Sequence, residues 1–373
     1  MTSESPGDRR KRQRAANRFA RALEAHQSGD LPLAERRYLK VLELQRKHLG
    51  ALNNLGEALR QQDKLAQAVG RFEQALSVQP EAPGVLKNMA LALRDLGELS
   101  RAEATTRRSI ALDDSDAQAW FLLGEILVDS DAPSQATEAY ERCLSLDPAD
   151  TFGAALRIAH LDSTRLPQKT SDAYVEAVYK HAAGQWDESA SGRGRYRGPE
   201  LLLAALRPFV DQERSLVVLD AGCGTCLGGP LLRPLARKLV GVDLSPHMLA
   251  HAQHKDLYDA LHAEDLVTFV DRSGGFDLII CAAVLIHFGD LEKPLSAFRR
   301  SLNPQGLLAF TTFEDAREAI LVNRFGYYTH SGAYVRQILG GCGFEVLYSS
   351  TEVQEYHAGQ PVACLVSVAR RRD

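Results

Sequence analysis

A period of 34 residues runs through the first part of this chain and constrains its fold more than any other feature. Alanine recurs once in each period, at Ala34, Ala68, Ala102 and Ala136. Four residues after each alanine comes a mostly aromatic column, with Tyr38, Phe72, Thr106 and Tyr140. Several columns that share one spacing predict a repeated unit of two short amphipathic helices. Because one helix pair cannot bury its apolar face alone, the units are expected to stack.

The columns resemble the tetratricopeptide repeat. Small residues stand twelve positions ahead of each alanine, at Ala22, Gly56, Ala90 and Gly124. Two units end in proline, at Pro80 and Pro148. The resemblance implies an N-terminal α-solenoid over residues 15–161, with four units and a capping helix at 151–161. The polar and basic residues 1–14 are expected to form a disordered tail.

Repeats of this family bind peptides on a concave surface, which makes a protein or peptide the expected partner. The resemblance assigns four residues to groove-facing columns, Asn53, Arg60, Lys87 and Arg94. Lys87 and Arg94 are seven positions apart and therefore share a helix face. Two interpretations remain open. The basic side chains form either a solvated face or a site for an acidic peptide or a C-terminal carboxylate.

Composition limits the class of protein. The formal net charge of −4 gives no general attraction to nucleic acid, so a nucleic-acid partner is not expected. The longest apolar run, Leu278 to Ile286, is too short to span a membrane, and the polar N-terminus is no secretory signal. Six scattered cysteines predict a reducing, cytoplasmic location. Cys223 and Cys226 form one C-x-x-C pair without a second pair nearby, so no metal site is expected.

The repeat period disappears after a Pro167-containing stretch at 162–172, which is expected to be a linker. Strands and helices then alternate over 173–373, as in a Rossmann-like doubly wound sheet of seven strands. The expected strands are Leu216–Asp220, Leu239–Asp243, Leu266–Val270, Phe276–Cys281, Gly306–Thr312, Phe344–Tyr348 and Val362–Val368. Helices are expected near 199–209, 228–237, 246–256, 291–302 and 331–340.

The first of these strands ends in LVVLDAGCGT, where Gly222 and Gly224 allow a sharp turn and close approach of a ligand to the backbone. A dinucleotide fingerprint would place Gly or Ala three residues after Gly224, but this chain has Leu227. Asp243 lies 19 residues beyond Gly224, at the end of the second strand. A carboxylate there can accept both ribose hydroxyls.

At this point the second half resembles the class I S-adenosylmethionine-dependent methyltransferases, in LDAGCGT, VGVDLSPHML, FDLIICAAVLIHFGDL and LNPQGLLAF. The order of the two parts is similar to that of a predicted bacterial family of tetratricopeptide-containing methyltransferases. The resemblance implies S-adenosylmethionine as the cofactor. It gives a cofactor-binding set of Asp220, Ala221, Gly222, Gly224, Asp243, Leu244, Asp265, Leu266 and Cys281.

Within that set the resemblance implies separate roles. Asp220 would orient the methionine amino group, the turn would contact methionine and ribose, and Asp243 would hold the ribose hydroxyls. For Asp243 a helix-capping role together with Ser245 remains the alternative. Asp265 would accept from the adenine amino group, with Leu266 and Leu244 against the ring. Cys281 would be a small lining residue near the methionine tail.

Methyl transfer from a sulfonium is a one-step displacement that needs alignment and a dry cleft more than special side chains. His287, after the fourth strand, is the candidate general base, with a packing or capping role as the alternative. The expected function is methyl transfer to an unidentified acceptor, with the repeats recruiting a protein. The alternative is an interaction scaffold whose methyltransferase-like domain senses cofactor but is catalytically weak. Leu227 argues against a nicotinamide-dependent oxidoreductase.

Overall fold

The structure is a computed structural model that describes residues 6–187, 192, 196–210, 215–315, 317–357 and 359–373. It divides the chain into two compact units, Met1–Pro148 and Ala149–Asp373. Within the described residues, no helix combines the length and the apolar character that crossing a membrane requires. Each unit is described below by itself.

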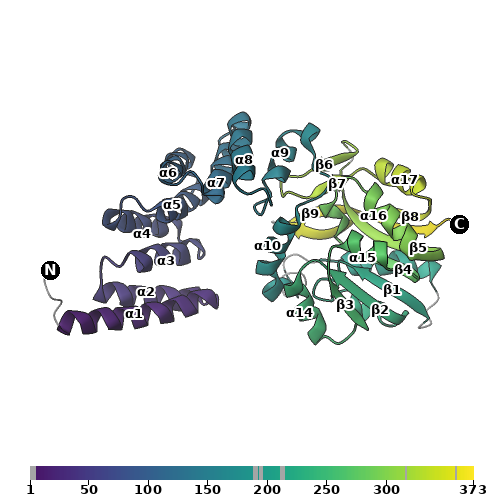
Figure 1. The fold of residues 1–373 in the computed structure, drawn as a ribbon, viewed down its shortest axis with the longest axis horizontal. Helices are drawn as coiled ribbons and strands as arrows, with labels where there is room; N and C mark the ends of the chain where they lie inside the picture. The colour runs from purple at the N-terminus through teal and green to yellow at the C-terminus, as the bar shows by residue number, and fades with distance from the viewer. Residues whose placement is uncertain (1–5, 188–191, 193–195, 211–214, 316, 358) are drawn as a thin grey trace. The chain divides into compact units, whose positions relative to one another are not determined.

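The first unit is a row of paired helices, coloured purple to teal in Figure 1. Their bounds are α1 Pro6–Gln27, α2 Leu31–Leu44, α3 Leu49–Arg60, α4 Leu65–Val78, α5 Pro83–Asp95, α6 Leu99–Leu112, α7 Ala117–Asp129 and α8 Pro133–Leu146. The small column lies where paired helices approach closely. A Cβ on Gly124 would lie 2.4 Å from the ring of Tyr140, and one on Gly56 would lie 2.6 Å from Phe72. The α-helical repeat predicted from the 34-residue period is confirmed.

Helix α1 differs from the sequence expectation, because it begins at Pro6 rather than after a disordered tail. Residues 1–5 lie outside the described part. The segment that follows is rich in Arg, Lys, Gln and Ala, which are good helix formers. Ala15 and Ala22 are fully buried and lie seven positions apart, so they share the helix face that packs on the repeat core. The exposed basic turns therefore continue a helix that packing already stabilises.

The expected solenoid cap is also different. Helix α9, Ala154–Leu161, falls in the second unit and packs with the short strand β6, Ile320–Val322. Its Leu156 and Ala159 share a small core with Val322 and Tyr328. His160 Nδ1 lies 2.9 Å from the carbonyl oxygen of Val322. This helix therefore covers the second unit instead of closing the solenoid.

The expected linker is an ordered strap along the second unit. The Thr170 N–H donates to the His287 carbonyl at 2.8 Å, and the Gly289 N–H donates to the Gln168 carbonyl at 2.8 Å. A short 3-10 turn, Ser163–Arg165, precedes this pairing. The strap, residues 163–170, is thus hydrogen-bonded to the segment that carries His287.

The second unit is built on one sheet. Its core follows the order β3-β2-β1-β4-β5-β9-β8, in which β9 runs antiparallel to β5 and β8. A small antiparallel pair, β6 and β7, attaches to the end of β5, so the described sheet has nine strands instead of the expected seven. The bounds are β1 Leu216–Ala221, β2 Ala236–Asp243, β3 Ala260–Ala263, β4 Phe276–Cys281, β5 Leu302–Glu314, β7 Tyr328–His330, β8 Phe344–His357 and β9 Gln360–Arg371. The doubly wound class is confirmed.

Helices cover both faces of this sheet, so the strands are buried between two apolar cores. The helices are α10 Asp172–Ala182, α12 Gly198–Leu206, α13 Gly229–Leu232, α14 Pro246–His254, α15 Leu266–Arg272, α16 Glu292–Ser301 and α17 Gly332–Gly341. The expected helix at 228–237 is only α13, because Pro234 cannot continue it and β2 begins at Ala236.

The strand expected at Leu266–Val270 is wrong, since these residues form α15. Asp265 caps the helix, with its Oδ1 accepting from the Thr268 N–H at 2.9 Å. The buried residues Leu266, Val267, Phe269 and Val270 follow a helical spacing as well as an apolar run. The third strand lies just before them, at Ala260–Ala263.

Candidate functional site

The glycine turn after β1 is held against β2. Gly222 and Gly224 have φ angles of 80° and 53°, in the left-handed region that favours glycine. A Cβ on Gly222 would lie 2.0 Å from Cγ2 of Val284, so no larger residue fits there. A Cβ on Gly224 would meet nothing within 4 Å, and this glycine lines the cavity. The backbone at Gly224 is therefore open to close approach by a ligand.

Asp243 ties the turn to the end of β2. Its Oδ2 accepts from the Gly224 N–H at 2.9 Å, and its Oδ1 accepts from the Ser245 N–H at 2.8 Å. Burial raises the pKa of this carboxyl, while the two backbone hydrogen bonds act in the opposite direction. Ser245, and not Asp243, caps helix α14, by accepting from the Met248 N–H. A carboxylate that faces the cavity keeps lone pairs for further donors.

Asp220 lies at the start of the turn and is 5 % exposed. Tyr258 donates its O–H to Asp220 Oδ2 at 2.7 Å. Burial raises the pKa of Asp220 to about 6, although the Tyr258 hydrogen bond opposes the shift. Asp220 also lines the cavity, so its other carboxylate oxygen is available to a positively charged donor.

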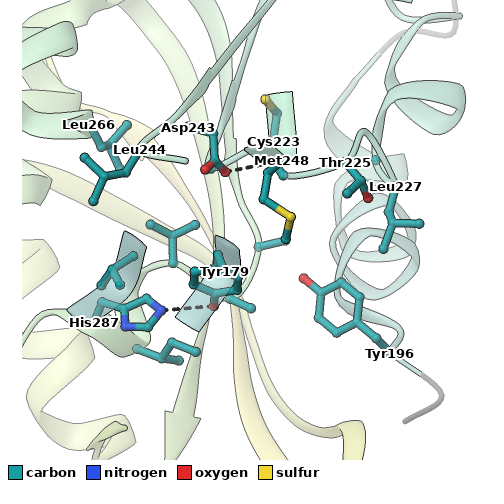
Figure 2. Close-up of a pocket in the computed structure, with 18 of the residues that line it drawn as sticks. Tyr179, Tyr196, Cys223, Thr225, Leu227, Asp243, Leu244, Met248, Leu266 and His287 are labelled. Atoms are coloured by element: carbon teal, nitrogen blue, oxygen red, sulfur yellow. Dashed lines mark hydrogen bonds between the residues drawn. The ribbon is translucent and has the colours of Figure 1, made fainter. Parts of the chain in front are cut away.

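These residues border a cavity of about 780 Å³, near the upper part of the range of roughly 300–1,000 Å³ for ligand pockets. Figure 2 shows Asp243, Leu244 and Leu266 at one end, with Tyr179, Tyr196 and His287 at the other. The first end brings together most of the expected cofactor set. The lining members are Asp220, Gly222, Gly224, Asp243, Leu244, Asp265 and Leu266.

Ala221 and Cys281 are not brought to this cavity. Both are fully buried in the apolar core on one face of the sheet. Successive residues of a strand point to opposite faces, so their neighbours Asp220 and Ala282 line the cavity in their place. Burial raises the pKa of the Cys281 thiol, which keeps it neutral.

Asp265 is engaged within the protein. Besides capping α15 through Oδ1, its Oδ2 accepts from Lys169 Nζ at 3.1 Å. Burial works against ionisation, but the Thr268 and Lys169 hydrogen bonds outweigh it and lower the pKa of Asp265. Lys169 belongs to the strap and also pairs with Asp172 at 2.7 Å. Sequence reasoning missed Lys169 because it lies in the expected linker.

His287 lines the second end of the cavity, in a 3-10 turn, Leu285–His287, after β4. Its Nε2 lies 3.1 Å from the Tyr179 hydroxyl, and its Nδ1 is buried without a hydrogen-bond partner. Burial lowers the pKa of His287 to about 4, so the imidazole is neutral at neutral pH. A neutral imidazole can accept a proton.

A helical cover closes the cavity, formed by α10, the 3-10 turn Ala183–Gln185 and the residues up to Asp187. Thr225 of the glycine turn donates to Asp187, and Lys255 Nζ donates to the same carboxylate at 2.5 Å. Tyr179 and Trp186 of this cover line the cavity and were missed by sequence reasoning.

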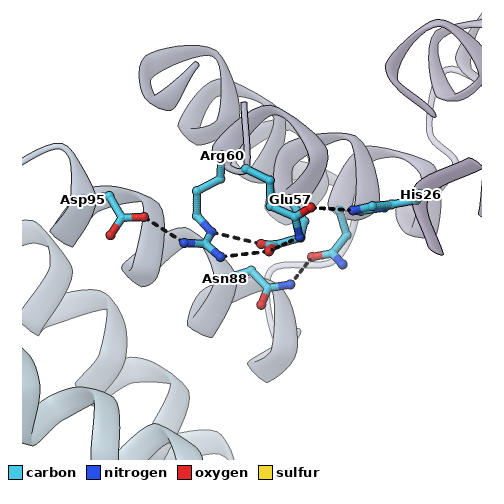
Figure 3. Close-up of polar contacts among 7 residues, drawn as sticks. His26, Glu57, Arg60, Asn88 and Asp95 are labelled. Carbon is cyan, nitrogen blue, oxygen red and sulfur yellow. Dashed lines mark hydrogen bonds and ion pairs between the residues drawn. The ribbon is translucent and has the colours of Figure 1, made fainter. Parts of the chain in front are cut away.

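Arg60 and Arg94, two of the residues assigned to the repeat groove, belong to a ladder of contacts between repeats, of which Figure 3 shows the pair Arg60–Asp95. In three successive units, a polar residue at the end of a first helix contacts a residue 35 positions later. The pairs are His26–Gln61 at 3.3 Å, Arg60–Asp95 at 2.8 Å and Arg94–Asp129 at 2.6 Å. The donors and the acceptors both recur at the 34-residue period.

Other members of the expected groove set are also engaged. Lys87 Nζ donates to Asp116 Oδ2 at 2.6 Å, and Asn88 donates to Asn53 Oδ1 at 3.0 Å. Arg60 and Arg94 contact a second carboxylate each, on Glu57 and Glu125. These cations are therefore already paired within the protein, and an acidic ligand would compete with their carboxylate partners. Asp95 and Asp129 stand in the column next to Arg60 and Arg94, whereas Glu57, Glu125 and Asp116 stand in columns further away, so a search within single columns finds none of them.

Comparisons with known proteins agree with both units. A tetratricopeptide-repeat family model matches residues 19–85, 53–115 and 87–151, and a methyltransferase-domain family model matches residues 219–308. The chain carries tetratricopeptide repeats followed by a methyltransferase domain, as the sequence resemblance implied.

Curated relatives of part of the chain are methyltransferases. A malonyl-[acyl-carrier protein] O-methyltransferase of Yersinia pestis is 28% identical over 141 residues, 38% of this chain and 51% of the relative. A ubiquinone biosynthesis O-methyltransferase of Cereibacter sphaeroides is 35% identical over 120 residues, 30% of this chain and 44% of the relative. The chain thus spans about half the length of the curated relatives that it matches.

Solved structures also align with part of the chain. A structure of MamA aligns with a TM-score of 0.36 at 22% identity, over 46% of this chain and 96% of MamA. The 1,6-didemethyltoxoflavin-N1-methyltransferase of Burkholderia thailandensis, solved with its substrate and S-adenosylhomocysteine, aligns with a TM-score of 0.44. Its identity is 19%, over 54% of this chain and 88% of that enzyme.

Proposed function

We propose that this protein is an S-adenosylmethionine-dependent methyltransferase. The observation that carries the proposal is the hydrogen bond from the Gly224 N–H to Asp243, in a glycine turn whose backbone is open to the cavity at Gly224. This bond fixes a carboxylate beside a backbone position that a ligand can approach closely. The donor set suits a ligand with ribose hydroxyls, an amino group and a flat apolar base.

The roles of the lining residues follow from their chemistry. Asp243 accepts from ribose hydroxyls, and the free oxygen of Asp220 accepts from the methionine ammonium. Leu244 and Leu266 enclose the adenine ring. Asp265 already holds Lys169 and caps α15, so we propose that it contacts adenine only through its remaining lone pairs. S-adenosylmethionine supplies an activated methyl group when it is bound.

We propose His287 as the general base for the acceptor. Its place on the cavity wall and its bond to Tyr179 support this role. The lowered pKa keeps the imidazole neutral but makes it a weak base, which suits an acceptor proton that becomes acidic as the new bond forms. Tyr179 fixes the orientation of the imidazole ring. The helical cover excludes water and holds the acceptor in line, which is the larger part of catalysis in a one-step displacement.

Calorimetric titration of the full chain with S-adenosylhomocysteine tests this proposal. We expect a single binding event, and no binding of NADH to the same cavity. A correctly folded protein that gives no heat with S-adenosylhomocysteine would refute the cofactor assignment. Transfer of a tritiated methyl group to a lysate component then separates an active enzyme from a cofactor-sensing scaffold, which would bind but not transfer.

We propose that the repeats recruit a protein or peptide, either the acceptor or a docking partner. An acidic ligand would have to displace Asp116 or Asp129 from Lys87 or Arg94. The test compares methylation at limiting partner in the wild type and in the pair Lys87→Met and Arg94→Met. Neutral substitutions avoid placing like charges beside those carboxylates. Lys40→Met with Arg71→Met, on second helices, is the matched control. An unchanged KM in the test pair would mean that the ladder does not bind the acceptor.

All six cysteines are buried, and six in 373 residues do not make the dense disulfide framework of a small secreted domain, which supports a reducing compartment such as the cytoplasm.

A further inference from the structure

The second end of the cavity is lined by a continuous series of rings. Tyr179 contacts Trp186 on one side and His287 on the other, with ring centroids 5.5 and 5.9 Å apart. His287 in turn lies 5.7 Å from Tyr327, which continues the series toward Phe325 through His357. We call this surface the aromatic wall, made of Trp186, Tyr179, His287, Tyr327, His357 and Phe325.

The aromatic wall lies apart from the cofactor end. Its residues come from the helical cover, from the turn after β4, from the loop between β6 and β7, and from the end of β8. Apart from His287, they fall outside the region of the methyltransferase-domain match. Phe325 is 39 % exposed although it lines the cavity, so it stands at the rim. The rings meet edge to face or tilted, with interplanar angles from 47° to 89°, so the wall offers both ring faces and ring edges to a flat ligand.

One carboxylate faces this wall. Glu355 lies on β8, lines the cavity and is held by His357, whose Nε2 is 2.8 Å from Oε1. Its side chain is 18 % exposed. Burial raises the pKa values of Tyr179, Tyr196 and Tyr327, and the charge of Glu355 adds to the shift at all three. A neutral imidazole with its proton on Nε2 makes the same bond without cancelling the charge of Glu355.

A carboxylate among aromatic faces attracts a cation twice, by direct charge and through the ring quadrupoles. Among the described residues that line the cavity, Lys169 is the one basic side chain apart from histidine. It forms ion pairs with Asp172 and Asp265. An anionic ligand would therefore meet Glu355 without a compensating cation from these residues.

We infer that the methyl acceptor is a flat aromatic molecule that carries a basic amine, bound between the aromatic wall and Glu355. This inference rests on the proposed methyltransferase function. The ammonium first loses one proton to water, and the freed lone pair of the amine forms the new N–C bond. The bond from the methyl carbon to sulfur breaks with its electrons staying on sulfur, so the products are a methylated ammonium, a neutral thioether and the released proton.

Three probes that share one ring and differ in charge test the inference. They are tyramine, 4-ethylphenol and 3-(4-hydroxyphenyl)propionate, titrated into the full chain saturated with S-adenosylhomocysteine. We expect tyramine to bind about tenfold or more tighter than 4-ethylphenol, and the propionate to bind weakest. Propionate binding at least as tight as tyramine would overturn the inference, and so would preferential methylation of the phenol oxygen of 4-ethylphenol.

Two variants and one control variant separate the effect of the Glu355 charge from the effect of the ring surface. Glu355→Gln should weaken tyramine about tenfold and leave 4-ethylphenol unchanged. Glu352→Gln, which removes the same charge on the same strand but outside the cavity, should change neither. Tyr327→Leu should weaken tyramine and 4-ethylphenol alike, because it removes a ring but no charge. An unchanged ratio of the two ligands in Glu355→Gln would refute the role of this carboxylate.

Binding of S-adenosylhomocysteine to each variant is measured first. If the wild type does not bind S-adenosylhomocysteine, the proposed function is contradicted. If it binds S-adenosylhomocysteine but the three probes bind with another order of affinities, only the acceptor class is contradicted.

Discussion

Tyr258 donates its hydroxyl hydrogen to Asp220 at 2.7 Å, although 38 positions separate the two residues. The bond connects a residue two positions before β3 with the carboxylate at the start of the glycine turn. It gives a buried acid one strong donor but does not fully offset the loss of water, since the pKa of Asp220 stays raised at about 6. The cofactor site therefore contains a charge that the fold alone does not stabilise.

Asp220→Asn should stabilise the protein without cofactor at neutral pH. Wild-type Asp220 takes up a proton in the folded state below about pH 6, whereas the unfolded chain does so only near its ordinary value of 3.8. The folded state therefore loses stability as the pH rises from about 4 to about 6, and the loss persists above. Asparagine avoids this loss and still accepts from Tyr258. We expect a gain of about 1–3 kcal/mol near neutrality.

Urea unfolding of wild type and Asp220→Asn across this pH window measures the difference. The variant should also bind S-adenosylhomocysteine more weakly, because it no longer offers a charged acceptor to the ammonium. Asp271→Asn, at an exposed ion pair with Arg300, is the control and should show neither change. Equal stability of Asp220→Asn and wild type at all pH values would contradict the assignment of a raised pKa.

Gly222→Ala should destabilise the second unit and abolish cofactor binding. The new Cβ would lie 2.0 Å from Val284, and the φ of 80° is unfavourable for alanine. Together these effects should cost at least about 2 kcal/mol. Gly340→Ala is the matched control, since nothing lies within 4 Å of its Cβ position in helix α17. Thermal unfolding should show a lower midpoint for the first variant and an unchanged or higher one for the second.

Asp243→Ala should weaken S-adenosylhomocysteine binding by about 1–3 kcal/mol, from the loss of charge-assisted hydrogen bonds. The glycine turn should also loosen, because the Gly224 N–H loses its acceptor. Calorimetry gives the dissociation constant, and hydrogen exchange at Gly224 reports on the turn. A normal dissociation constant together with fast exchange would reduce Asp243 to a purely structural role.

The ion pair of Arg94 and Asp129 should couple neighbouring repeats. Both side chains are partly exposed, at 27 % and 40 %, so a double-mutant cycle with Arg94→Ala and Asp129→Ala should give only about 0.2–1 kcal/mol. The coupling energy should fall as salt is added. A coupling energy of zero at low salt would mean that the ladder is not a stabilising contact.

The fragment 149–373 should bind S-adenosylhomocysteine like the full chain, whereas 173–373 should bind it more weakly. Lys169 and Thr170 line the cavity, and the strap hydrogen-bonds to the residues beside His287. The longer fragment keeps this wall and the shorter one loses it. Equal affinities of two folded fragments would show that the strap does not contribute to the site.

Local signals predicted much of this protein. The 34-residue period fixed the paired helices, and the order of strand, glycine turn and Asp243 located one end of the cavity. Those features depend on neighbours in sequence. Tyr258, Lys169 and Glu355 could not be found in this way, because they reach the site through pairings between distant segments. Ala221 and Cys281 were misassigned because the alternation of strand faces places them in the core.

The strap has a consequence for how this architecture can be recombined. All the described residues that line the cavity lie beyond residue 168, and the packing that supports the strap begins with helix α9. The division between the units falls earlier, between Pro148 and Ala149. A chimera joined at that point can receive a foreign helical array while keeping its chemistry, whereas one joined at residue 173 loses Lys169, Thr170 and Asp172 from the wall of its cavity.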